Sequence, residues 1–466
     1  MDARLKRILL TSLLAGLAFA GHACGGSQAA PPATATAGSS LAPAASPSTT
    51  GSATAPAGSG ASAATKLGTS AGVATTAKAP DFEPLPGAKA QFGTLGKAVY
   101  RIEVPDHWNG ELVLWAHGYR GPGTEVNTEN PPNGLRKTLV EEGYAWAASS
   151  YSENGYTPGI GADDTLALKR LFEQKVGKPK RTYIAGSSMG GNVVALSLEY
   201  FPTEYDGALA MCGALGGEEE IDYLVSWNRL AEYLSGAKIA YGPGTTTVQA
   251  TASLGQVMAP LGDPAAPTDK GRQFLSLIRL LTGGPRPFFI EGVKQQWVVN
   301  FAFVLIDPEG TSLPGRAATN EATQYAIEPG LGLTAEQVNG GVVRQKADPQ
   351  ARNATLHPDA VPTTGQISVP LLTLHNTGDL FVPVSQEQSY RRKADAAGKG
   401  DLLVQRLIRD GGHCKFSDQE LTTAWNDLRA WVADKKKPKG DDLLGDLSDA
   451  GRQFTNPLRP TDPGTK

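Results

Sequence analysis

The chain has 466 residues, of which 43 are Lys or Arg and 46 are Asp or Glu, so its formal net charge is −3. Its length predicts one large domain with additions, or two domains, and its balanced charge gives no reason to expect nucleic acid as a partner. With 55 Gly, 33 Pro and only 3 Cys, the composition excludes a coiled coil, a helical repeat and a four-cysteine zinc site.

The first 23 residues have the pattern of an export signal. Basic residues precede an uncharged, mostly apolar stretch from Ile8 to Ala20. This stretch is shorter than the roughly 20 residues that a bilayer-spanning helix needs. We therefore predict that residues 1–23 form a signal peptide and that the protein is exported.

Two cleavage sites compete at the end of this signal. Ala18-Phe19-Ala20 suits an ordinary signal peptidase, whereas Gly21-His22-Ala23-Cys24 is similar to a bacterial lipobox, in which the cysteine carries the lipid. A lipobox usually has Leu where this chain has Gly21, but the glycine-rich, polar sequence after Cys24 is typical of one. We favour lipidation of Cys24, which would leave the lipid anchor as the only membrane contact; the alternative is secretion.

The two ends of the chain differ in composition from the rest. Residues 24–80 consist almost entirely of Ala, Ser, Thr, Pro and Gly, with no aromatic and no acidic residue. Such a segment buries too little apolar area to offset its ordering entropy, so we predict a disordered tether. Residues 435–466 are polar and contain several prolines, and we predict a polar tail that begins with a solvated lysine run.

Between these ends, apolar runs bounded by Gly, Pro or Asp alternate with helical patterns. The expected strands are Val99–Val104, Leu112–Ala116, Tyr144–Ser149, Arg181–Ala185, Gly207–Met211, Val369–His375 and Leu402–Leu407. The expected helices are Leu135–Glu142, Asp164–Val176, Asn192–Tyr200, Gln386–Ala397 and Asp418–Val432, the last preceded by a capping box of Ser417 and Glu420. The alternation predicts an α/β fold with a mainly parallel sheet and helices on both faces.

The alternation stops in residues 213–368. This stretch is rich in aromatic residues, so it is unsuited to a linker, and it is too long for a loop. We predict a cap that is inserted after the expected strand Gly207–Met211. It divides the core into a first part, residues 81–212, and a second part, residues 369–434.

Gly186-Ser187-Ser188-Met189-Gly190 has the form G-x-S-x-G. The pattern alone is weak, because Gly68-Thr69-Ser70-Ala71-Gly72 matches it inside the predicted tether. Ser188, however, lies between an expected strand and an expected helix. A tight strand-to-helix turn exposes the serine and needs small residues two positions to either side, which Gly186 and Gly190 supply. We predict that Ser188 is a nucleophile.

A serine hydroxyl needs a base to remove its proton and an acid to orient that base. We predict that His413 is the base, because Asp410-Gly411-Gly412 precede it after the last strand and glycines let the loop turn back over the sheet edge. The other histidines have other assignments. His22 belongs to the signal peptide, and His107 and His357 lie in polar turns. His375 belongs to a strand, and His117 lies in the loop after an early strand.

Asp379 is the predicted acid. It follows the strand Val369–His375 and so lies at the carboxyl end of that strand, where catalytic groups collect on open α/β sheets. Asp410 and Glu387 are weaker candidates. For the oxyanion hole we predict two backbone N–H donors: Met189, which follows the nucleophile, and Tyr119, in the loop after an early strand. His117 then shapes that loop.

With these residues in place, the chain resembles the α/β-hydrolase superfamily, in the form of a secreted bacterial member. The motifs that carry the resemblance are, in family order, His117-Gly118, Gly186-x-Ser188-x-Gly190, Gly378-Asp379-x-x-x-Pro383 and Gly412-His413. It covers roughly Ala98–Met211 and Val369–Val432, and the predicted cap occupies the place of the family's variable lid. The resemblance implies acyl transfer through an acyl-serine intermediate with neither metal nor cofactor. A lone His-Gly departs from the His-Gly-Gly-Gly of many esterases.

Cys212 ends a strand and Cys414 follows the predicted base, so both lie at the same edge of the expected sheet. A disulfide between them fits this placement and an exported protein, and two buried free thiols are the alternative.

The predicted function is a serine hydrolase that cleaves small carboxylic esters. A serine peptidase of the aminopeptidase or oligopeptidase type, acting on short peptides, is the close alternative. Glu218-Glu219-Glu220 could then anchor a substrate amino group, against the plainer interpretation of a solvated charge run. A non-catalytic binding lipoprotein is a third possibility, which the presence of all three triad residue types disfavours.

Overall fold

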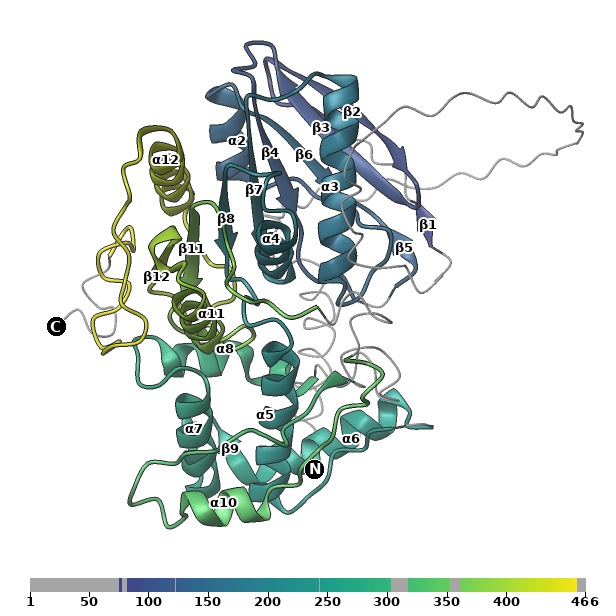
Figure 1. Cartoon of the computed structure of the whole chain (residues 1–466). Helices are drawn as coiled ribbons and strands as arrows, with labels where there is room; N and C mark the ends of the chain where they lie inside the picture. Colours follow the sequence, from purple (N-terminus) through teal and green to yellow (C-terminus); the bar gives the residue numbers. More distant parts are fainter. Residues whose placement is uncertain are drawn as a thin grey trace, which may run out of the picture.

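The computed structural model of the chain describes residues 75–77, 82–121, 123–242, 244–302, 317–352 and 361–458. The predicted signal peptide, Cys24 and almost all of the predicted tether lie outside these ranges. A central sheet carries helices on its faces, and a group of further helices lies beyond one end of it (Figure 1). Within the described ranges, no helix combines the length and the hydrophobicity that crossing a bilayer requires.

Eight strands form the central sheet, in the order β2-β3-β6-β4-β7-β8-β11-β12. Their bounds are β2 Ala88–Leu95, β3 Ala98–Pro105, β4 Glu111–Ala116, β6 Ala145–Ser149, β7 Arg181–Ser187, β8 Gly207–Met211, β11 Leu371–Asn376 and β12 Leu403–Ile408. β3 pairs antiparallel with β2 and β6, and the other neighbouring pairs are parallel. The loops that follow β4, β7, β8, β11 and β12 therefore all leave the same edge.

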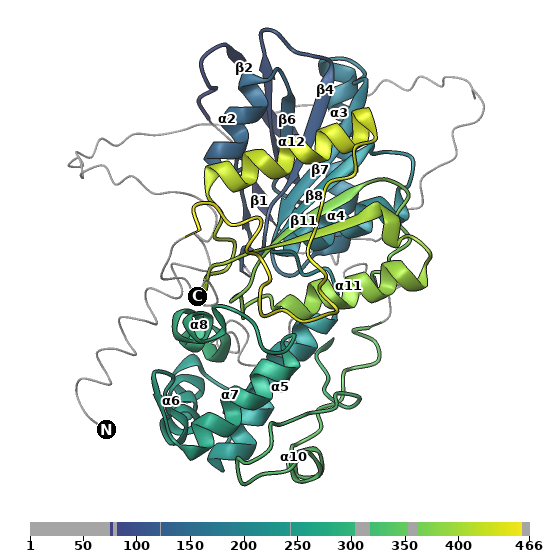
Figure 2. The same ribbon diagram turned by 90° about the vertical axis from the view of Figure 1, so that its left-hand side faces the viewer.

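Helices cover both faces of the sheet. On one face lie α3 (Pro158–Lys175), α4 (Met189–Tyr200) and α11 (Val384–Ala396); on the other lie α2 (Asn133–Glu141) and α12 (Asp418–Asp434). Figure 2 views the sheet from the α12 side. Leu112 and Leu114 of β4 pack into the core of the first face and Val113 and Trp115 into that of the second, as the period of two in a strand requires. The predicted α/β class is confirmed.

The expected elements lie within three residues of their predicted bounds except at the start of α3. α3 begins at Pro158, six residues before the expected Asp164, and Pro at the first position of a helix is favourable. β2 was not expected, because none of its side chains is fully buried and its sequence, AKAQFGTL, has no apolar run. The predicted capping box of α12 is present: Glu420 N donates to Ser417 Oγ over 3.2 Å and Ser417 N donates to Glu420 Oε2 over 2.7 Å.

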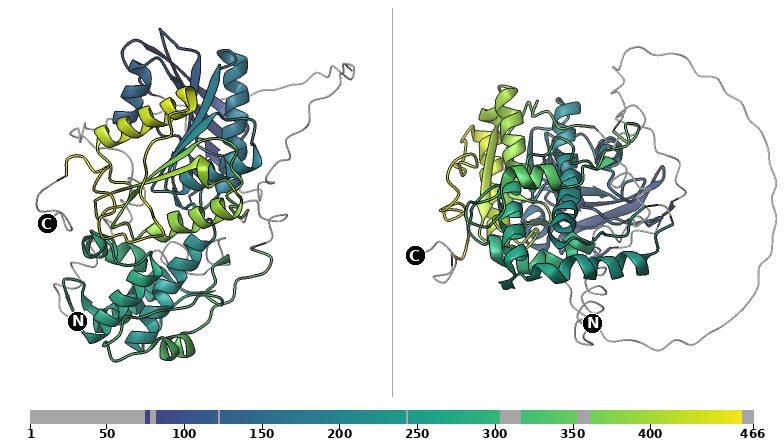
Figure 3. Two further views of the ribbon diagram at one scale, coloured as in Figure 1. Left: turned by 60° about the vertical axis from the view of Figure 1, so that its left-hand side comes forward. Right: turned by 90° about the horizontal axis from the view of Figure 1, so that it is seen from below.

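A helical segment separates β8 from β11 in the chain. Its helices are α5 (Glu219–Ser235), α6 (Thr247–Met258), α7 (Asp269–Leu281), α8 (Phe289–Ala302) and α10 (Ala335–Gly341). They gather beyond the sheet edge, next to α11, as Figure 1 and both views of Figure 3 show. The short elements of the fold are β1 Thr76–Ala77, β5 Glu125–Val126, β9 Gly262–Asp263, β10 Ala266–Pro267, and the 3-10 helices η1 Ala259–Leu261 and η4 Gly400–Leu402.

The helical segment has an aromatic core of its own. Trp227, Phe274, Trp297 and Phe301 contact one another with ring centroids 5.1–6.0 Å apart, mostly edge to face, the favoured arrangement of aromatic pairs. Leu380, in the loop after β11, belongs to the same cluster. The segment is thus anchored directly to a loop of the central sheet, and its action as a lid over a substrate stays a prediction.

The prediction of a polar tail from residue 435 is wrong for most of that segment. Leu443, Leu447 and Ala450 are buried together with Leu407 and Val384. Backbone groups of β12 are engaged as well: Asp441 N donates to the carbonyl of Gln405, and Asp441 Oδ2 accepts from Leu407 N, both over 2.7 Å. The composition is polar overall, but Leu443, Leu447 and Ala450 recur every three or four residues and are buried together.

This packing predicts a difference between two adjacent leucines. Leu443 is 1% exposed and Leu444 is 47% exposed. We expect Leu443→Ala to lower the free energy of unfolding by about 2–4 kcal/mol, through lost burial and a residual cavity, and Leu444→Ala to change it by less than about 0.5 kcal/mol. Urea unfolding followed by circular dichroism measures both, and equal small effects would show that the C-terminal segment is not packed.

Candidate active site

Ser188 stands between the last residue of β7 and the first residue of α4. Its backbone has φ 58° and ψ −124°, a left-handed conformation that a residue with a side chain adopts only when the surroundings enforce it. Its N–H donates to the carbonyl of Met211 over 2.9 Å, which ties the turn to β8. The strained strand-to-helix turn predicted around Ser188 is present.

Close backbone approach explains the glycines around Ser188. A Cβ on Gly190 would lie 2.1 Å from the carbonyl oxygen of Ala116, and one on Gly186 would lie 2.5 Å from the carbonyl oxygen of Gly190. A Cβ on Gly118 would come within 3.2 Å of the Ser188 Cβ. The loop after β4, where the second oxyanion donor is predicted, therefore passes directly beside Ser188.

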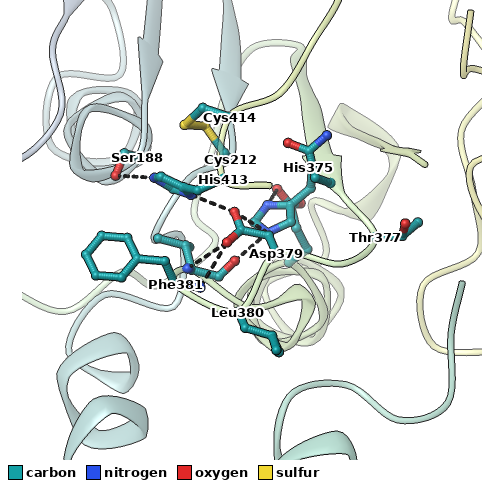
Figure 4. A network of polar contacts seen from close by, with 12 residues as sticks. Ser188, Cys212, His375, Thr377, Asp379, Leu380, Phe381, His413 and Cys414 are labelled. Carbon is teal, nitrogen blue, oxygen red and sulfur yellow. Dashed lines mark hydrogen bonds and ion pairs between the residues drawn. A yellow bond between two sulfur atoms is a disulfide. The ribbon is translucent and has the colours of Figure 1, made fainter. Parts of the chain in front are cut away.

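The structure brings the three predicted triad residues together (Figure 4). The His413 ring lies between the other two: its Nε2 is 2.9 Å from Ser188 Oγ, and its Nδ1 is 2.6 Å from Asp379 Oδ2. Both distances are those of hydrogen bonds. The three residues come from the loops after β7, β11 and β12, which leave the same sheet edge.

Asp379 is completely buried. Its Oδ1 accepts from the backbone N–H groups of Phe381 and Val382, over 3.0 and 3.1 Å, and its Oδ2 faces His413. The Phe381 ring meets the His413 ring edge to face, with centroids 5.3 Å apart. The carboxylate is thus oriented by its own turn, and its remaining oxygen is directed at the imidazole.

Asn376 and Gln296 position the two loops, and neither was expected from the sequence. The Asn376 side chain accepts from Lys415 N over 2.8 Å and donates to the Lys415 carbonyl over 2.7 Å, which fixes the chain just after His413. Gln296 of α8 accepts from Leu380 N over 2.9 Å and donates to the Gly411 carbonyl over 2.8 Å. It therefore bridges the loop that carries Asp379 and the loop that carries His413, which we call the acid loop and the base loop. Only the position of Asn376 at a strand end could have drawn attention to it.

α8 also packs tightly against these loops. A Cβ on Gly292 would lie 1.7 Å from the Gly378 carbonyl oxygen, and one on Gly411 would meet the Glu291 backbone at 2.9 Å. One helix of the inserted segment thus supports the acid and base loops.

Cys212 and Cys414 form a disulfide with a Cα–Cα distance of 5.3 Å. Cys414 directly follows His413, so the bond ties the base loop to the end of β8 (Figure 4). Potential metal-ligand atoms of Cys212, His413 and Cys414 also lie within 4.8 Å of one another. Because the two sulfurs are bonded to each other, neither is a thiolate that could bind a metal.

The weaker acid candidates lie elsewhere. Asp410 Oδ1 accepts from Gly412 N over 2.7 Å and so closes the turn before His413. Glu387 is buried next to His375, in the interior of the core. Neither carboxylate hydrogen-bonds to the His413 ring in the structure, whereas Asp379 does.

The remaining histidines lie as expected where the structure describes them. His107 is exposed in a turn, and His375 is buried in β11. His117 is buried, stacks on Tyr151, and has ring nitrogens 2.7 and 3.0 Å from the carbonyl oxygens of Gly118 and Ser150. Burial, and then the charge of Arg120, lower the pKa of His117 to about 4, so its ring is neutral at neutral pH. His22 and His357 lie outside the described residues.

Glu218, Glu219 and Glu220 lie at the start of α5, and only Glu219 is exposed to solvent. Glu218 pairs with Arg352 at 2.9 Å, and Glu219 with Lys393 at 2.9 Å. Glu220 is 4% exposed, and burial, with the nearby charge of Asp379, raises its pKa well above the usual range. Two of these carboxylates are thus paired with cations of the chain, and burial disfavours the charged form of the third.

No family model matches the sequence. The o-phthalyl amidase of Xanthobacter agilis is a distant homologue, 22% identical over 391 residues that cover 70% of this chain and 83% of that protein. Among solved structures, an esterase from Aspergillus oryzae aligns over 75% of this chain and 80% of its own, with 13% identity and a TM-score of 0.43. A puromycin hydrolase aligns over 78% of this chain but only 42% of its own, with 13% identity and a TM-score of 0.37.

The disulfide predicts a thiol count and a stability change. In Cys24→Ser protein, denaturation without reductant should expose no titratable thiol, and reduction should release both remaining ones. The bond spans 202 residues of sequence, so the Cys212→Ala/Cys414→Ala variant should lose about 2–4 kcal/mol of unfolding free energy relative to Cys24→Ser. Two thiols titrating before reduction would contradict the bond.

Proposed function

We propose that this chain, which has the α/β-hydrolase fold, is a serine hydrolase whose catalytic residues are Ser188, His413 and Asp379. The observation that carries the proposal is the continuous hydrogen-bond chain from Ser188 Oγ through the His413 ring to Asp379 Oδ2. A nucleophile, a base and an orienting acid in this order and geometry are what acyl transfer by a serine requires.

In the proposed reaction, Ser188 Oγ attacks the carbonyl carbon of the substrate while its proton passes to His413 Nε2. The new C–O bond creates a tetrahedral oxyanion. When the bond to the leaving group breaks, His413 returns the proton to the departing oxygen or nitrogen, and an acyl-serine remains. A water molecule then attacks the acyl carbon while its proton passes to His413; as the bond between the acyl carbon and Ser188 Oγ breaks, His413 returns this proton to Oγ, which releases the acid and free Ser188. Asp379 accepts from His413 Nδ1 and stabilises the imidazolium.

For the oxyanion we propose the backbone N–H groups of Met189 and Tyr119. Met189 is the first residue of α4, so its N–H has no acceptor within the helix, and the helix N-terminus favours negative charge. Tyr119 follows Gly118, which passes beside the Ser188 Cβ. The neutral, buried His117 fixes this loop through its contacts with Tyr151 and Ser150.

Carboxylic esters are the substrates that we propose first, since an alkoxide needs less help to leave than an amine. A second candidate is hydrolysis of amides, which the distant similarity to an o-phthalyl amidase favours. The aminopeptidase-type alternative is weaker, because Glu218 and Glu219 pair with cations and cannot anchor a substrate amino group.

We also propose that the protein is exported, since a disulfide suits an oxidising compartment. We further propose that Cys24 carries a lipid.

The nucleophile can be tested against a matched motif in the same chain. A fluorophosphonate probe should label the wild-type protein and lose at least about 99% of its labelling in Ser188→Ala, because the probe reacts only with an activated serine. Ser70→Ala alters the serine of the second G-x-S-x-G pattern and should keep full labelling. A folded wild-type protein that resists the probe would favour the non-catalytic binding protein instead.

The choice between esters and amides needs paired substrates. We expect 4-nitrophenyl esters to give kcat/KM at least about 100-fold above the 4-nitroanilides of the same acids, a difference of roughly 2.7 kcal/mol in barrier height. N-phthalyl amides form a third series. Faster turnover of either amide series would reverse the ester assignment and leave the acyl-serine mechanism in place, provided that Ser188→Ala abolishes that turnover.

A further inference from the structure

His375 of β11 lies on the far side of Asp379 from His413, and Figure 4 shows Asp379 between the two rings. His375 Nε2 is 3.9 Å from Asp379 Oδ2, the same oxygen that faces His413 Nδ1 at 2.6 Å. Both His375 and Asp379 are completely buried. The titratable ring of His375 therefore adjoins the Asp379 carboxyl group at a place where water cannot screen a charge on the ring.

The second nitrogen of His375 faces another buried carboxylate. Its Nδ1 is 3.4 Å from Glu387 Oε1. The other oxygen of Glu387 accepts from Thr373 Oγ1 over 2.8 Å and from Gln405 Nε2 over 2.5 Å. That oxygen therefore has two donors, and the oxygen that remains, Oε1, has the His375 ring as its neighbour. A fully buried anion needs a cation nearby, and His375 is the ring that the geometry supplies.

The contacts of His375 suit a ring with protons on both nitrogens. Nε2 is 2.8 Å from the carbonyl oxygen of Val382, which can only accept, and Nδ1 faces the Glu387 carboxylate. Burial alone would lower the pKa of His375, but the hydrogen bond and charge of Glu387, with the charge of Asp379, raise it above its usual value. His117 lacks such carboxylate partners, and burial lowers its pKa to about 4.

We propose that His375 is an imidazolium held between Glu387 and Asp379, and that it acts as a positioning residue by balancing the charge of the Asp379 carboxylate that orients His413. The effect on catalysis rests on the proposed function. The protonation of the His375 ring does not. With Asp379 and Glu387 ionised, the cluster carries one net negative charge. It becomes neutral when His413 takes the proton of Ser188.

Other charged and titratable groups face this cluster. Arg286 donates from Nε to the Thr377 carbonyl over 2.6 Å and acts electrostatically on Asp379. From α5, Glu220 and Tyr223 also interact with Asp379, and burial raises the pKa of each well above its usual value, which disfavours a negative charge on either. Tyr390 of α11 interacts with Glu387, and burial likewise raises its pKa well above the usual value. These groups surround the cluster, while His375 lies between its two carboxylates.

The proposal predicts a shift in the pH dependence of catalysis. His375→Gln removes one positive charge near Asp379, so protonated His413 becomes more favourable and the acidic limb of kcat/KM should move to higher pH by about 1 unit. Adding Glu387→Gln to this variant removes one negative charge and should return the limb toward wild type. A purely structural role predicts no such return. His107→Gln, an exposed histidine, should leave the limb unchanged.

The measurement uses the full chain and the substrate series that turns over fastest, with circular dichroism to confirm folding. An acidic limb that stays in place or moves to lower pH in folded His375→Gln overturns the proposal, as does a double variant with the same shift as the single. A folded wild-type protein that is not labelled by the fluorophosphonate would instead defeat the proposed function. Failure of the inference and failure of the proposed function are therefore distinguishable.

A second measurement depends on neither activity nor the folding of a variant. Nitrogen NMR of wild-type protein with labelled histidine reports the protonation of each ring. We expect one histidine, assigned through its contact with Val382, to keep both nitrogens protonated at pH 8, where ordinary histidines are neutral. A neutral His375 ring at pH 7 overturns the proposal.

Discussion

The buried carboxylate of Asp379 is the constraint on which the candidate site depends. A charge without access to water must be met by donors on every side, and here they come from separate parts of the chain. Its own turn supplies two backbone N–H groups, the base loop supplies His413, and β11 places His375 beneath it. The loops after β11 and β12 therefore have to meet, and the disulfide and Asn376 fix the second loop where that meeting occurs.

The helical segment beyond the sheet edge also helps to hold Asp379 and His413 in place. Gln296 bridges the acid and base loops, and Tyr223 and Asn300 both donate to the Leu380 carbonyl. Gly292 lets α8 approach the Gly378 backbone. Sequence changes in this segment therefore act on the geometry of the triad residues as well as on any surface that contacts a substrate.

Sequence reasoning located Ser188, Asp379 and His413 because each has a local signature: a glycine-flanked turn between a strand and a helix, or a loop directly after a strand. Most strands of the sheet follow from similarly local patterns, whereas their order in the sheet was not predicted. Gln296 could not be found, because a glutamine in an aromatic helix acquires its role only when two distant loops meet it. β2 was missed because an edge strand needs few buried residues, and the C-terminal segment because three apolar side chains are hidden in a polar composition.

The C-terminal segment affects how readily the protein can associate with other chains. β12 is the last strand of an open sheet, and such an edge offers unpaired backbone groups to any neighbouring chain. Here the carbonyl of Gln405 and the N–H of Leu407 are occupied by Asp441, and the N–H of Arg409 by the Thr455 hydroxyl. The segment thus covers part of the open edge of β12 without forming a strand. A chain shortened before it would keep its triad residues and gain a surface for edge-to-edge aggregation.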